Sequence, residues 1–268
     1  MTKRWRIHTV EGPGLPAGKL LAALENHHDR TVALWNSLTA DQWTRPSRNR
    51  DWTIHQTARH TADALEMGLS RITGSTTPFS MDGFDPNTSP ASWLAESDGE
   101  TPSQTIDRYV ATSEQARSAV AARLAADDRT VIGAPYGVAH WATLVVHLLW
   151  DSWLHERDIA CALELDAPST TDEQRLVGLY AVLMALVPLR GADPHIDELL
   201  YLGGDVDTTI RGRTDGATIE VREVPEPCGV GADAAALIDS LSGRGTPITE
   251  LVPAIPEPLT LFAAYLSS

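Results

Sequence analysis

Residues 138–165 read VAHWATLVVHLLWDSWLHERDIACALEL, a long and strongly apolar stretch that predicts a buried helix. At about 100° per residue, one stripe of this helix collects five apolar residues: Trp141, Leu144, Leu148, Ile159 and Ala162. Asp151 and His155 lie in the middle of the same stripe, one helical turn apart. A carboxylate buried among apolar side chains costs several kcal/mol unless it is paired or bound to a metal. The stretch therefore predicts a partner for Asp151.

The spacing of Asp151 and His155 allows both side chains to reach a single cation. The alternatives are a buried hydrogen bond between the two, or an ion pair between Asp151 and an arginine from another helix. His147 lies one turn earlier, near the edge of the stripe, and is the weaker candidate. A metal site in a helical bundle needs at least a third ligand from another helix. Four other histidines are candidates, and spacing leaves the choice open: His27, His28, His55 and His60.

Working outward, the pattern predicts further helices at about 20–38, 54–72, 102–126 and 171–188. Three of them begin with capping signals, at Thr53–Gln56, Thr101–Gln104 and Thr170–Glu173. Helices of this kind, with connections of varied length, form a bundle. Residues 74–99 are rich in Ser, Thr, Pro, Gly and Asp and predict a long surface loop, of the kind that forms a lid or a wall of a binding site.

The pattern changes after Gly191. Residues 199–202, 207–211 and 217–222 predict short strands, with a hairpin turn at 214–216. Helices are expected at 232–241 and 259–266. The fold class predicted is mainly α, with a helical bundle over 1–190 and a small α+β domain over 191–268.

The composition limits the classes of partner. The chain has 268 residues, with 21 Lys plus Arg against 36 Asp plus Glu, a net charge of −15 that argues against nucleic acid. No apolar run reaches the roughly 18 residues of a membrane span, and no apolar segment of a secretory signal follows the basic start. Two cysteines are too few for a disulfide framework. We expect a cytoplasmic protein. The strong preference for Arg over Lys is typical of a GC-rich bacterial genome.

Several motifs occur in the order found in one family. They are Leu38-Thr-Ala-Asp-Gln-Trp43, Arg45-Pro-Ser47, Asp51-Trp-Thr-Ile-His-Gln-Thr-Ala-Arg-His60, Pro135-Tyr-Gly137, His147-Leu-Leu-Trp-Asp-Ser-Trp-Leu-His-Glu-Arg-Asp158 and Ala234-Ala-Ala-Leu-Ile-Asp-Ser-Leu-Ser-Gly-Arg244. Together they resemble the mycothiol-dependent maleylpyruvate isomerase-like family over nearly the whole chain. The resemblance implies a DinB-like four-helix bundle followed by a small sterol-carrier-like α+β domain.

The resemblance also implies a divalent metal, typically zinc, held by His60, Asp151 and His155. The family usually has Glu where this chain has Asp151, and because Asp is one methylene shorter, the ion would lie closer to the helix, bind weakly or be absent. Three protein ligands leave an open position, which is typical of a catalytic site. The implied cosubstrate is mycothiol, whose thiolate would add to an electrophilic double bond for cis–trans isomerisation or remain attached in S-transfer.

Other residues receive supporting roles in this interpretation. Arg244 and Arg71 could hold a carboxylate of substrate or thiol, or lie on the surface, and Asp63 or Asp158 could orient a metal-bound histidine. The expected partners are a small-molecule substrate and a low-molecular-weight thiol, in a monomer or homodimer. Two alternatives remain: a metal-free DinB-like protein that binds small molecules, and a thiol-independent enzyme of natural-product biosynthesis.

Overall fold

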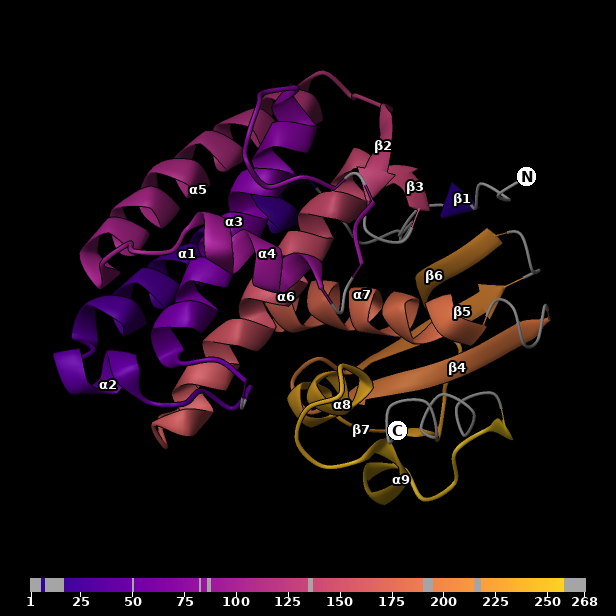
Figure 1. Ribbon diagram of the computed structural model, residues 1–268. Helices are drawn as coiled ribbons and strands as arrows, with labels where there is room; N and C mark the ends of the chain where they lie inside the picture. The colour runs from indigo at the N-terminus through magenta and orange to yellow at the C-terminus, as the bar shows by residue number, and fades with distance from the viewer. Residues whose placement is uncertain are drawn as a thin grey trace. The chain divides into compact units, whose positions relative to one another are not determined.

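The computed structural model describes residues 6–7, 17–49, 51–81, 83–85, 88–134, 137–189, 195–214 and 218–257 (Figure 1). The chain divides into two compact units. The bundle unit comprises Leu21–Pro135 and Asp151–Ser169, and the sheet unit comprises Met1–Leu20, Tyr136–Trp150 and Thr170–Ser268.

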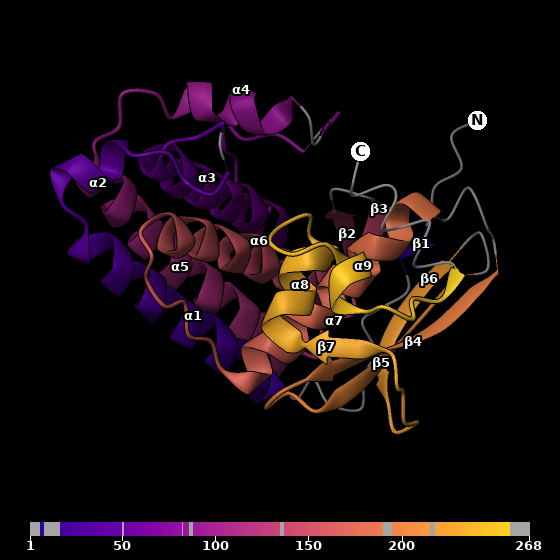
Figure 2. The same cartoon turned by 90° about the horizontal axis from the view of Figure 1, so that it is seen from below.

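The bundle unit is helical. Its elements are most of α1 (Ala17–Ser37), then α2 (Ala40–Thr44), α3 (Ile54–Thr73), α4 (Ser89–Glu96), α5 (Pro102–Ala125), the short strand β2 (Val131–Ala134) and the second part of α6 (Trp141–Ala162). Helices α1, α3, α5 and α6 are the long helices of the bundle, and α4 packs on α3 (Figure 2). Their buried apolar cluster consists of Trp35, Trp43, Ile54, Ala58, Ala62, Tyr109 and Ile159.

The capping signals read from the sequence are confirmed. Oγ1 of Thr53 accepts a hydrogen bond from the Gln56 backbone at 3.1 Å, and the Gln56 side chain accepts one from the Thr53 backbone at 2.9 Å. The equivalent pair begins α5 at Thr101. Each reciprocal pair satisfies two backbone donors that a helix start leaves open, so these helices begin where the sequence predicts.

The connection after α3 contains more structure than the predicted loop. Gly74 ends α3 in the left-handed conformation, with φ of 77°, which glycine adopts without steric cost. Residues 89–96 then form α4, with a proline in its first turn. The apolar residues Trp93 and Leu94 of this short helix are buried, which explains why a segment of polar composition is ordered here.

The sheet unit is an α+β arrangement. Its strands are β1 (Arg6–Ile7), β3 (Gly137–His140), β4 (Ile196–Gly203), β5 (Thr208–Thr214), β6 (Thr218–Val224) and β7 (Gly231–Asp233), and its helices are the first part of α6, then α7 (Thr171–Leu189), α8 (Ala234–Leu241) and α9 (Ile248–Leu251). The strands neighbour one another in the order β3-β1-β6-β5-β4-β7. The predicted hairpin is confirmed by the antiparallel pairing of β5 with β6, in which Thr214 faces Ile219.

Helix α7 packs against β5 and β6 of this sheet. Gly212 in β5 permits the close approach, because a Cβ there would lie 2.9 Å from Leu186 Cδ1 and 3.1 Å from Val182 Cγ1. The division into compact units therefore places α7 with the sheet, whereas the boundary predicted at 190/191 places it with the bundle.

The predicted fourth helix begins later than expected. Residues 137–140 form β3, which pairs with β1 through Val138 and Arg6, and α6 begins at Trp141 and ends at Ala162. Pairing with a segment far away in sequence therefore decided the conformation of these residues, which local apolar content could not show. The helix expected at 259–266 lies outside the described residues. Among the described helices, none is long and apolar enough to cross a membrane.

Candidate metal centre

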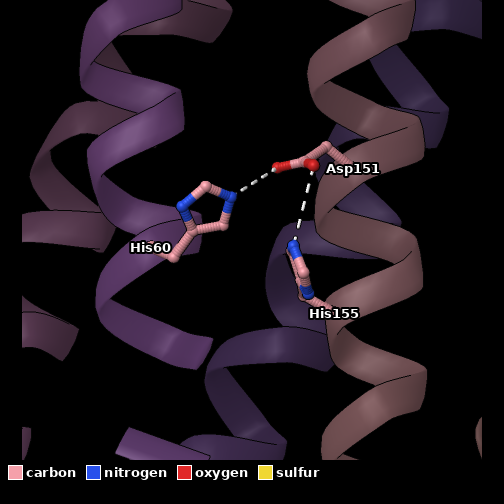
Figure 3. Close-up of side chains that lie close together, drawn as sticks. All are labelled: His60, Asp151 and His155. Carbon is pink, nitrogen blue, oxygen red and sulfur yellow. Dashed lines mark ion pairs between the residues drawn. The ribbon is translucent and has the colours of Figure 1, made fainter. Parts of the chain in front are cut away.

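Three side chains of the bundle unit converge between α3 and α6 (Figure 3). Nε2 of His60 on α3 lies 3.8 Å from Oδ2 of Asp151, and Nε2 of His155 lies 3.6 Å from Oδ1 of the same carboxylate. One potential ligand atom from each residue lies within 4.8 Å of the other two. The side chains of both histidines are 7% exposed and that of Asp151 is 18% exposed, so the group is most open at the carboxylate.

The geometry of this triad fits a small divalent cation. Two ligands on a tetrahedral zinc ion at 2.0–2.1 Å lie about 3.3 Å apart, slightly closer than the observed 3.6 and 3.8 Å. Both separations are too long for a hydrogen bond between histidine and carboxylate. The alternative interpretation, a simple Asp151–His155 hydrogen bond, is therefore not what the structure contains. Two imidazoles and one carboxylate are also the donor types that zinc accepts.

A second carboxylate, that of Asp158, lies near the other ring nitrogen of His155. Nδ1 of His155 lies 3.2 Å from Oδ2 of Asp158, one turn further along α6, and Asp158 is fully buried. Nε of Arg48 donates to Oδ1 of Asp158 at 2.7 Å, and the backbone N–H of Arg48 donates to the Asp158 carbonyl at 2.9 Å. A proton on Nδ1 is held by Asp158 in this arrangement, which leaves Nε2 to face Asp151 with its lone pair.

Aromatic rings flank His60. The Trp52 ring centroid is 4.8 Å from that of His60 and 5.9 Å from that of His155. Trp93 of α4 lies nearly parallel to the His60 ring, at 6.3 Å and 19°. The expectation that residues 74–99 form a wall of the site agrees with this position of Trp93, which the sequence pattern did not single out.

Three acidic side chains surround Arg108 of α5, and one of them, Asp63, follows His60 by about one turn on α3. Nη2 of Arg108 donates to Oδ1 of Asp63 at 2.7 Å, and the same guanidinium contacts Glu66 at 3.4 Å and Glu100 at 2.8 Å. Burial raises the pKa of Asp63 to about 6, although Arg108 and a hydrogen bond from Ser97 act to lower it. Asp63 therefore supports Arg108, whereas Asp158 is the carboxylate that contacts a triad histidine.

Comparison with known proteins gives the family. The sequence profile of the DinB superfamily matches residues 23–159, half of the chain. The chain belongs to the DinB superfamily. Two solved structures share its fold, the mycothiol-dependent maleylpyruvate isomerase, with a TM-score of 0.57, and a mutant of it, with 0.55. In both cases the identity is 18%, and the match covers 91% of this chain and 96% of the other. No curated protein matches the sequence. The predicted fold class, a DinB-like bundle with a small α+β part, is confirmed.

Spacing left open which histidine joins Asp151 and His155. In the structure His60 lies near Asp151, whereas the other candidates contact different groups or belong to the other unit. His55 Nε2 lies 3.2 Å from Thr105 Oγ1, and burial lowers its pKa. His28 stacks on Tyr109, and burial also lowers its pKa. His27 contacts Ser152 at 2.6 Å. His147 belongs to the sheet unit.

The two arginines expected to hold a carboxylate lie away from the triad or in the other unit. Arg71 follows His60 by three helical turns on α3, about 16 Å along the axis, and it is exposed. Arg244 belongs to the sheet unit, where its Nη1 donates to the Ser242 carbonyl at 3.4 Å. The role predicted for each stays a prediction.

Sequence reasoning missed a second polar face of α6. Ser152 and Glu156 follow Asp151 and His155 by one residue each and face α1. Arg30 holds Glu156 with two hydrogen bonds, at 2.7 and 2.9 Å. The signal was present in the sequence, since two polar residues spaced by four in an apolar helix predict a polar contact on that face.

Proposed function

We propose that this DinB protein is a metal-dependent enzyme that activates a low-molecular-weight thiol, mycothiol, for isomerisation or S-transfer on an electrophilic small molecule. The observation that carries the proposal is the convergence of His60, Asp151 and His155 within 4.8 Å. The shared fold with the mycothiol-dependent maleylpyruvate isomerase supports the choice of thiol and reaction class. Zinc is the proposed ion because two imidazoles and a carboxylate suit it.

A divalent cation at the triad would stabilise a thiolate at neutral pH and provide one open position for it. His60 and His155 would supply neutral nitrogen ligands, and Asp151 would supply the charge that balances part of the cation. Asp158 would keep the proton of His155 on Nδ1, since it lies 3.2 Å away on that side of the ring. Arg244 and Arg71 are proposed to hold a carboxylate of the substrate or thiol.

The proposed reaction involves no net oxidation or reduction. The thiolate forms a C–S bond with one carbon of an electrophilic double bond, and the π electron pair moves to the conjugated acceptor group. Rotation about the resulting single bond and cleavage of the C–S bond return the thiolate and give the other isomer. In S-transfer the C–S bond persists, and a proton from solvent is taken up by the neighbouring carbon.

The first test is the metal content of protein purified without a chelating tag. We expect about one divalent ion per chain, lost in His60→Ala and His155→Ala. His55→Ala is the matched control, because His55 lies on the same helix but contacts Thr105. Failure to bind zinc on titration would overturn the proposal and favour a metal-free small-molecule binding protein.

The second test separates the two reactions. Maleylpyruvate, the substrate in the name of the structural relative, is the first compound to offer with mycothiol. Isomerisation leaves the thiol concentration constant, whereas S-transfer consumes one thiol for each acceptor. Retention of metal with no thiol-dependent turnover on a panel of electrophiles would favour the thiol-independent alternative.

A further inference from the structure

Four aromatic rings from three separate segments form a continuous run beside the triad. Trp52 contacts His60, His60 stacks with Trp93, and Phe84 lies 5.5 Å from Trp93. Trp93 is buried, whereas Trp52 and Phe84 are each half-buried. We call Trp52, His60, Trp93 and Phe84 the aromatic run.

Trp52 is held firmly in this run. Its backbone N–H donates to the Asn49 carbonyl at 3.0 Å, and its carbonyl accepts from the Ser47 N–H at 2.9 Å. The indole packs on both triad imidazoles, whose ring centroids are 5.0 Å apart. A partly exposed indole that packs on both imidazoles offers an apolar surface to a ligand.

Trp52 also lies beside the place where the three potential ligand atoms converge. Its ring centroid is 4.8 Å from that of His60 and 5.9 Å from that of His155, and the two histidines belong to the group of three. A ligand held at the triad would therefore have the partly exposed indole among its neighbours.

We propose that Trp52 selects acceptors whose electrophilic double bond is conjugated with a planar ring or polyene. This inference rests on the proposed function and names the class of substrate for that site. Stacking favours a planar unsaturated group over a saturated group of equal size by about 0.5–1.5 kcal/mol, or about 2- to 13-fold in affinity.

The test uses three metal-directed probes on the zinc-loaded protein: benzohydroxamate, cyclohexanecarbohydroxamate and acetohydroxamate. The first two have rings of equal carbon number and differ in planarity. We expect benzohydroxamate to bind about 5- to 10-fold more tightly than the cyclohexane compound in calorimetric titration. Trp52→Leu should bring the two affinities together, and Trp52→Phe should keep most of the preference.

The affinity for acetohydroxamate and the zinc content are the controls. Each should be the same in Trp52→Leu as in the unsubstituted protein if the variant is folded and its triad is intact. If the leucine variant does not fold, the preference for benzohydroxamate is measured in Trp52→Phe instead. Equal affinities in the unsubstituted protein, or a preference that survives Trp52→Leu, would overturn the inference alone. Absence of zinc binding would instead overturn the proposed function and this inference with it.

Discussion

The Asp158 carboxylate lies 3.2 Å from Nδ1 of His155, on the side of the imidazole opposite to the Nε2 that faces Asp151. One turn of α6 thus carries both a potential metal ligand and the group that orients it. The carboxylate is in turn fixed by Arg48. Contacts of this kind determine which ring nitrogen carries the proton, and therefore which nitrogen can bind a cation.

Asp158→Asn should weaken zinc binding about 10- to 100-fold, because an amide holds the Nδ1 proton less firmly than a carboxylate. Zinc affinity is measured by competition with a chelator, well below the melting temperature of each variant. Asp107→Asn is the control, since Asp107 is exposed on α5. Unchanged affinity in a folded Asp158→Asn protein would assign Asp158 a purely structural role.

The raised pKa of Asp63, about 6, predicts a pH-dependent contribution to stability. The folded chain holds this proton more firmly than the unfolded chain, so Asp63 favours folding below about pH 4, and that contribution is lost as the pH rises through 6. Each unit of pKa difference corresponds to about 1.4 kcal/mol.

The side chain introduced by Asp63→Asn cannot ionise. The difference in free energy of unfolding between the unsubstituted protein and this variant therefore isolates the contribution of Asp63. Urea unfolding at pH 4.5, 6.0 and 7.5 should show the unsubstituted protein losing free energy of unfolding relative to the variant as the pH rises. If the unsubstituted protein instead gained free energy of unfolding relative to the variant as the pH rose, the ion pair with Arg108 would outweigh the cost of burying the Asp63 carboxylate.

The buried contact between Glu156 and Arg30 predicts a large effect on stability. Burial opposes ionisation of Glu156, but hydrogen bonds from His27 and Arg30 outweigh it and lower the pKa of Glu156 below its usual value of 4.5. Its contribution is therefore present at neutral pH and is lost as the pH falls below that range.

Glu156→Ala should reduce the free energy of unfolding at pH 7 by about 3–5 kcal/mol, because Arg30 and His27 lose their buried partner. The double variant Glu156→Leu with Arg30→Met should cost less than this single change, since it removes both charges. Chemical denaturation measures both. A double variant less stable than Glu156→Ala would contradict this account.

The capping box of α3 predicts a smaller effect. Thr53→Ala removes the acceptor for the Gln56 N–H and should reduce the free energy of unfolding by about 1 kcal/mol. Thr53→Ser, which keeps the hydroxyl, should be close to neutral. A similar loss in both variants would indicate that packing of the threonine methyl group, rather than the hydrogen bond, stabilises the start of the helix.

Much of the bundle could be predicted because its signals are local. The Thr53 and Thr101 capping boxes involve residues three apart, and the turn that joins Asp151 to His155 lies within one helix. The strand at 137–140 could not be predicted in this way, because its conformation depends on pairing with Arg6. Trp93 was missed for the same reason, since its partner His60 lies on another helix.

The sequence by itself determined which residues form the long helices, where three of them begin, and that α6 carries an aspartate and a histidine on one face. Helical spacing left the choice among His27, His28, His55 and His60 open, and only the family resemblance pointed to His60. The tertiary structure brings His60 to Asp151 and His155 and places aromatic rings beside it. The physical reason is that helical periodicity records which residues share a face of one helix. Which faces meet depends on packing between distant segments, and that is fixed only when the bundle forms.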